Sequence, residues 1–193
     1  MLAKADDIKT QVLVLGALIG LMWVVGIANL LAFGGALNAN GIRPRTETGL
    51  WGILFAPFLH ANVAHLMANT VPCLVLGGLI LVRGLRDFVW ATAVAALVGG
   101  LGVWLIGGPN TVHIGASGLV FGYLGYLVLR GYWERSLTAI AVAVVAGVLY
   151  GGVLWGVLPL TRGVSWEGHL FGFVGGAAAA SAHRRPRAPS VDT

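Results

Sequence analysis

Charged side chains are scarce in this chain of 193 residues: only 10% are Asp, Glu, Lys or Arg, whereas 58% are hydrophobic. A soluble domain averages about 25% charged residues. So few charges cannot cover a surface that faces water, and the composition predicts a membrane protein of one domain. The net charge of +5 does not indicate nucleic-acid binding, because the basic residues stand between apolar runs rather than in one cluster.

Cysteine and intramembrane carboxylates are also in short supply. The single cysteine, Cys73, excludes an intramolecular disulfide, and we expect it to pack as a small apolar side chain. None of the long apolar segments contains Asp or Glu, which excludes an aspartyl protease with paired carboxylates in the membrane. The metalloprotease motif H-E-x-x-H is absent. We expect neither a metal nor a cofactor.

Six apolar segments predict an all-α, polytopic bundle of six transmembrane helices. They are about residues 10–33, 61–82, 88–106, 117–129, 137–158 and 168–182. A span needs about 20 residues, and the fourth segment has only 13. If Arg130 anchors one end of that segment, its other end, Ser117, is expected inside the membrane beside a water-filled pocket.

Basic residues predict the orientation in the membrane. With a cytoplasmic N-terminus, nine Lys and Arg lie inside and three outside, which favours both termini in the cytoplasm. The predicted parts are a cytoplasmic segment, residues 1–9, a six-span domain, residues 10–182, and a disordered cytoplasmic tail, residues 183–193. The long outer connection, residues 34–59, carries an amphipathic stretch suited to the membrane interface.

A serine between glycines begins the fourth segment, in the sequence Gly115-Ala116-Ser117-Gly118. Glycines allow a tight turn into a helix. The first N–H groups of that helix lack intrahelical partners and can stabilise a developing oxyanion. Taken alone, the pattern is more often a serine helix cap.

A histidine, His169, stands at the start of the sixth segment. It shares one helical face with two glycines, and the fourth segment has a glycine face of its own. Two such faces can pack closely, which would bring His169 to Ser117 as a general base. The alternative is a structural hydrogen bond between helices. The glycines are Gly172 and Gly176 on the sixth segment, and Gly118, Gly122 and Gly125 on the fourth.

The scarcity of carboxylates predicts a Ser–His dyad rather than a triad. Glu167, at the outer boundary, is the weaker candidate for a third member. Phe121, one turn after Ser117, is a candidate to stack on His169, with ordinary core packing as the alternative. We expect His113 to be a solvated loop residue, although it could line the pocket mouth.

The second segment carries His65 and Asn69, which lie on one helical face at a spacing of four residues. Together with the Ser117 N–H, their side chains could form an oxyanion hole. His60 need not share that face and could order the outer loop instead. A structural role is as good an interpretation of these residues as a catalytic one.

Together, these residues resemble the rhomboid family of intramembrane serine proteases. The resemblance covers about residues 10–182. It implies Ser117 as nucleophile, His169 as base, and an oxyanion hole made by His65, Asn69 and Ser117. The matching motifs are H-x-x-x-x-H-x-x-x-N at His60, His65 and Asn69, G-x-S-G at Gly115 to Gly118, and H-x-x-G-x-x-x-G at His169, Gly172 and Gly176.

The resemblance also implies transmembrane helices as substrates, cut near the outer face, and movement of the fifth span and of the loop at residues 159–167. Three features depart from the family pattern. Trp51 is not followed by Arg, Gly168 replaces a frequent alanine, and Phe121 stands where relatives often have tyrosine.

We therefore predict a serine endopeptidase in a bacterial inner membrane, with other transmembrane proteins and the lipid bilayer as partners and no nucleic acid. His60, Gly115, Gly118 and Phe121 would support the site. A non-catalytic relative that binds membrane helices is the second hypothesis. A transporter or channel is the third, disfavoured because neither intramembrane charges nor repeated halves are found.

Overall fold

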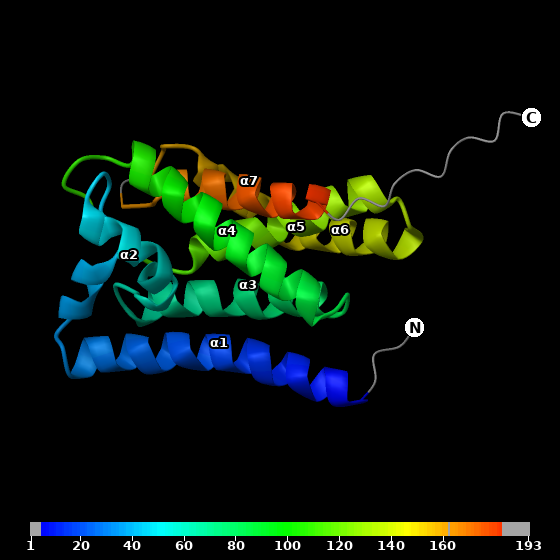
Figure 1. The fold of residues 1–193 in the computed structure, drawn as a ribbon, viewed down its shortest axis with the longest axis horizontal. Coiled ribbons are helices and arrows are strands. Elements are labelled where there is room, and N and C mark those ends of the chain that lie inside the picture. Colours follow the sequence, from blue (N-terminus) through cyan, green and yellow to red (C-terminus); the bar gives the residue numbers. More distant parts are fainter. Residues whose placement is uncertain (1–4, 162, 183–193) are drawn as a thin grey trace, which may run out of the picture.

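The computed structural model describes residues 5–161 and 163–182, and in these ranges it is all-helical (Figure 1). Within them, the one β-type pairing is an isolated bridge between Ile42 and His113. The helices, with η for 3₁₀ helices, are α1 (Ala5–Leu31), η1 (Ala36–Asn40), α2 (Glu47–Phe55), η2 (Ala56–Phe58), α3 (Val63–Leu81), α4 (Leu85–Ile106), α5 (Ser117–Glu134), α6 (Leu137–Tyr150), η3 (Gly151–Val157) and α7 (Trp166–Ala182).

The six predicted apolar segments correspond to α1, α3, α4, α5, α6 with η3, and α7. Helix α2 forms in the stretch of residues 34–59 that was expected to be amphipathic, but its exposed side chains are largely apolar, among them Leu50, Trp51 and Leu54, so the amphipathic pattern is not found. Among the described residues, α1, α3 and α4 are long and apolar enough to cross a membrane, and α6 is a shorter apolar helix of 14 residues. The all-helical membrane fold is confirmed, whereas the count of six spans stays a prediction.

Helix α5 is longer than the 13-residue segment in the sequence analysis. It runs to Glu134 and has 18 residues, about 27 Å at about 1.5 Å per residue. Its last turn is polar: Arg130 Nε lies 3.0 Å from a Glu134 carboxylate oxygen, and Arg83 from the α3–α4 turn pairs with the same carboxylate. The apolar part of α5 is the predicted segment, residues 117–129, and these ion pairs let a polar turn extend the helix beyond it.

The start of α1, the α3–α4 turn, the α5–α6 turn and the end of α7 lie at one end of the bundle, on the right in Figure 1. Helix α2 and the start of α5 lie toward the other end. The start of α1 and the end of α7 therefore lie at the same end of the bundle, whereas the positions of the two termini relative to the membrane stay a prediction. The tail predicted to be disordered, residues 183–193, and the first four residues lie outside the described residues.

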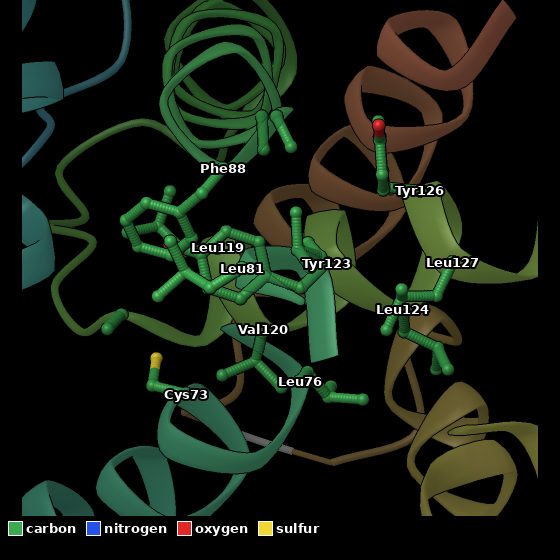
Figure 2. Close-up of a cluster of buried hydrophobic side chains, with 14 of the residues drawn as sticks. Cys73, Leu76, Leu81, Phe88, Leu119, Val120, Tyr123, Leu124, Tyr126 and Leu127 are labelled. Carbon is green, nitrogen blue, oxygen red and sulfur yellow. The ribbon is translucent and has the colours of Figure 1, made fainter. Parts of the chain in front are cut away.

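Helix α5 lies at the centre of the bundle, and its residues from Leu119 to Leu127 are buried. Tyr123 packs between Phe88 of α4 and the buried residues of α3, among them Cys73 (Figure 2). Cys73 thus packs as a small apolar side chain, as predicted. The Tyr123 hydroxyl lies 2.9 Å from the Thr92 hydroxyl. Its one polar atom is therefore hydrogen-bonded, as burial of a phenol requires.

Glycines set the close contact between α5 and α7. A Cβ added to Gly172 would overlap the carbonyl group of Gly118, and one added to Gly176 would overlap that of Gly122. The two backbones therefore touch with no side chain between them, which small residues alone permit. The predicted packing of two glycine faces is confirmed, and it brings the first turns of both helices together.

Candidate active site

Ser117 is the first residue of α5 and follows a sharp turn. The helix cap is Ala116, without a side-chain hydrogen bond, so the interpretation of Ser117 as a capping residue was wrong. The N–H groups of Leu119 and Val120 donate to the Ala116 carbonyl at 2.9 and 3.1 Å. The N–H groups of Ser117 and Gly118 precede these first intrahelical bonds, which leaves them directed out of the helix end.

His169 lies in the first turn of α7, with its side chain turned toward the start of α5. Its Nε2 is 2.9 Å from the Ser117 hydroxyl oxygen, although 52 residues separate them. The imidazole is largely buried, with 8% of the residue exposed. The two side chains that the sequence analysis expected to meet are therefore within hydrogen-bond distance.

The imidazole of His169 has two further neighbours. Its Nδ1 lies 2.9 Å from the carbonyl oxygen of Gly156 in η3. The Phe121 ring stacks on its face, with centroids 4.1 Å apart and 7° between the planes. The stacking is the arrangement that the sequence analysis considered for Phe121. The Gly156 contact was missed, because a main-chain carbonyl leaves no signal in the sequence.

His65 and Asn69 lie in the first turns of α3, which Asn62 caps by accepting a hydrogen bond from the His65 N–H at 2.8 Å. Both side chains face Gly115, whose φ of +108° favours glycine. A Cβ there would lie 2.8 Å from His65 Nε2 and 3.7 Å from Asn69 Nδ2. Asn69 Nδ2 donates one hydrogen bond to the His65 carbonyl at 2.9 Å, and an amide nitrogen carries two N–H donors.

His60 lies in the loop before α3 and is 1% exposed. Its ring packs edge-on against His65, with centroids 5.0 Å apart, and its carbonyl accepts a 3.4 Å hydrogen bond from Asn38. Burial, and then the charge of His65, lowers the pKa of His60 to about 4, against a smaller opposing effect of the Phe58 backbone. His60 is therefore a neutral ring near pH 7, and it supports His65 through the edge-on contact between the two rings.

His113 is not the solvated loop residue that we expected. Its Nδ1 lies 2.6 Å from the Ser165 hydroxyl and its Nε2 lies 2.8 Å from the Thr111 hydroxyl. Burial lowers the pKa of His113, and the neighbouring Glu167 carboxylate opposes that shift. His113 is enclosed because the segment that carries Ser165, which is distant in sequence, packs against its ring. Ser165, which this reasoning also missed, stands three residues before Gly168, a spacing typical of a helix cap.

A cleft of about 1140 Å³ opens onto these groups, between the first turns of α3 and the segment that leads into α7. A small cavity of about 50 Å³ also borders Ser117 and is bounded by His113 and Ser165. The candidate residues of the sequence analysis that line the cleft are His65, Asn69, His113, Ser117, Phe121, Glu167 and His169.

A sequence model of the rhomboid domain matches residues 47–186, which is more than half of the chain. The chain belongs to the rhomboid family. This rhomboid protein is 49% identical to an uncharacterized protein of Mycobacterium tuberculosis, over 82% of this chain and 75% of that protein. A Mycobacterium leprae protein, also uncharacterized, is 45% identical over 83% of this chain and 72% of its own length.

A more distant relative carries a functional name. Rhomboid-like protease 5 of Toxoplasma gondii is 28% identical over 74% of this chain, which corresponds to 17% of that larger protein. Family membership confirms the resemblance found in the sequence and, with the apolar helices, a membrane protein.

Proposed function

We propose that this rhomboid protein is an intramembrane serine endopeptidase that uses Ser117 and His169. The observation that carries the proposal is the 2.9 Å contact between the Ser117 hydroxyl and His169 Nε2, both of which line the cleft. A nucleophile within hydrogen-bond reach of a base that a third group orients is the arrangement of serine hydrolases.

In the proposed reaction, Ser117 Oγ attacks the carbonyl carbon of a peptide bond while His169 Nε2 takes its proton. The N–H of Ser117, Asn69 Nδ2 and His65 stabilise the negative charge that develops on the carbonyl oxygen. The imidazolium of His169 then protonates the leaving amine, and the C–N bond breaks. A water molecule, activated by His169, attacks the acyl ester and releases the acid and free Ser117.

Water has room to reach the ester. The small cavity beside Ser117 has a volume of about 50 Å³ and polar groups at His113 and Ser165, enough for an ordered water with polar partners. The remaining groups act by position. Gly115 allows His65 and Asn69 to approach, and Gly118 presents its backbone to Gly172 of α7. Phe121 and His60 pack against the imidazoles of His169 and His65.

We propose transmembrane helices of other proteins as substrates, cut near the outer face of a bacterial inner membrane, with both termini of this chain in the cytoplasm. A helix hides its carbonyls in backbone hydrogen bonds, so the substrate must unwind locally. We therefore expect helix-breaking residues near the cleaved bond. A small residue is expected at the cut, because the side chains of His65, Asn69 and His169 line the cleft together with Ser117.

A serine-reactive fluorophosphonate probe tests the proposal on the purified protein in detergent. Wild type should be labelled, and Ser117→Ala and His169→Ala should not. Ser181→Ala is the matched control, because Ser181 lies in α7, where its exposed hydroxyl donates to the Ala178 carbonyl. Undiminished labelling of Ser117→Ala would remove the assignment. Co-expression of wild type and Ser117→Ala with tagged single-span proteins then tests peptide cleavage itself.

A further inference from the structure

The neutral imidazole of His169 can act as a base toward Ser117 only if Nε2 carries a lone pair and Nδ1 carries the proton. Free imidazole allows either tautomer. Nδ1 lies 2.9 Å from the carbonyl oxygen of Gly156, and a carbonyl can only accept a hydrogen bond. Nδ1 is therefore the nitrogen that donates, and Nε2 is the one that faces the Ser117 hydroxyl.

We propose that Gly156 is a positioning residue whose main-chain carbonyl orients His169, in the place that a carboxylate takes in a catalytic triad. The inference rests on the proposed function and extends it to the third partner of the Ser–His pair. A carbonyl fixes the tautomer and the ring plane, and its negative end also stabilises the imidazolium that forms when Ser117 loses its proton.

Glu167 does not take this place. It is two residues before His169 on α7, and side chains at that spacing point to different sides of a helix. Its charge acts on His113 instead. Among the described residues, the Gly156 carbonyl is thus the partner that the geometry gives to Nδ1.

The position also requires glycine. A Cβ added to residue 156 would lie 2.9 Å from His169 Nδ1 and 3.1 Å from Phe121 Cζ. Both atoms belong to the stacked rings, whose planes are 7° apart, so a methyl group would push the imidazole away from the carbonyl and from Ser117. Glycine lets η3 approach the ring edge while Phe121 covers its face.

A matched control lies in the same 3₁₀ helix. A Cβ added to Gly152 meets nothing within 4 Å, so Gly152→Ala has the same effect on local chain flexibility without touching His169. The test compares wild type, Gly156→Ala and Gly152→Ala in detergent. It measures kcat and KM for a cleaved transmembrane peptide, the labelling rate with the fluorophosphonate, and thermal unfolding.

We expect Gly156→Ala to lower kcat about 10- to 100-fold with KM within about threefold of wild type, because a small misplacement of a catalytic group affects chemistry more than binding. Gly152→Ala should keep kcat within about twofold of wild type. Equal kcat values for Gly156→Ala and wild type would overturn the proposal.

A second measurement needs no substitution at Gly156, so it does not depend on whether Gly156→Ala folds. Nitrogen-15 NMR of histidine-labelled protein reports which ring nitrogen bears the proton, and a His169→Gln sample identifies the His169 signals. Wild type should show the proton on Nδ1 at neutral pH. A proton on Nε2 would overturn the proposal even if Gly156→Ala fails to fold. If Nδ1 bears the proton but the fluorophosphonate does not label wild type, the proposed peptidase fails while the role of Gly156 in orienting the ring stands.

Discussion

The His113 imidazole lies 2.6 Å from the Ser165 hydroxyl, and this contact joins the loop before Ser117 to the start of the helix that carries His169. Ser165 caps α7: its hydroxyl accepts from the Gly168 N–H at 3.3 Å, and its carbonyl accepts from the His169 N–H at 3.1 Å. The His113 backbone pairs with Ile42. One side-chain contact thus connects the two segments that present the candidate nucleophile and base.

We predict that His113→Ala and Ser165→Ala each lower the free energy of unfolding by about 1 kcal/mol, because each removes a hydrogen bond or a helix cap. The double variant should lose less free energy of unfolding than the two single variants together, since the residues share one contact. Thermal or denaturant unfolding in detergent measures all three. Strictly additive losses would show that the contact contributes nothing.

The buried His60 predicts a dependence of stability on pH. Its pKa is about 4 in the folded protein, against an ordinary value of 6.5. Between these two values the unfolded chain binds more protons, so the free energy of unfolding falls as the pH is lowered from about 6.5 to about 4, by the order of 1–3 kcal/mol.

The matched variant is His60→Phe, which keeps a ring against His65 and removes the titration. Its unfolding midpoint in detergent should vary less between pH 7 and pH 4.5 than that of wild type. A wild-type curve as flat as that of His60→Phe would exclude His60 as the source of the dependence.

Asn69 offers a test of the oxyanion hole. We predict that Asn69→Ala lowers kcat by about 10²–10³ with little change in KM, because the amide N–H acts on charge that develops only in the transition state. Asn40→Ala is the control, since Asn40 is exposed in η1 and its side chain donates to the nearby Leu37 carbonyl. If KM rises while kcat is kept, Asn69 binds the substrate instead.

The contact of α5 with α7 predicts that replacing glycine by alanine changes the free energy of unfolding differently at two positions. Gly172→Ala should lower the free energy of unfolding by about 1–3 kcal/mol or more, because its methyl group would overlap the Gly118 carbonyl. Gly147→Ala should be neutral or stabilise by up to about 1 kcal/mol, since nothing lies within 4 Å of it in α6. Unfolding in detergent compares them, and equal effects would contradict the packing.

Much of the fold was predictable because the membrane imposes a simple code. Long apolar runs predict helices, and glycines four residues apart define one face of a helix. That face is local information, so Gly172 and Gly176 could be matched to the glycines of α5 without coordinates. The same periodicity placed His169 beside Ser117, and the spacing of His65 and Asn69 placed both on one side of α3.

Other features depend on contacts that no local pattern contains. The polar turn that extends α5 beyond its apolar segment was not predicted, because one partner of that turn, Arg83, comes from the connection between α3 and α4. The solvated position expected for His113 was wrong, because its partner Ser165 lies in a loop 52 residues away. Contacts between loops follow no repeating spacing of residues, so they cannot be predicted from a sequence pattern.

The sequence by itself determined the helices, their small-residue faces and which side chains could perform the chemistry, since these follow from residue type and spacing. Only the tertiary structure decided which group lies against His169 Nδ1. The Gly156 carbonyl belongs to the main chain, which is alike at every position. Its contact with His169 depends on where η3 lies against α7, and packing of the whole bundle sets that placement.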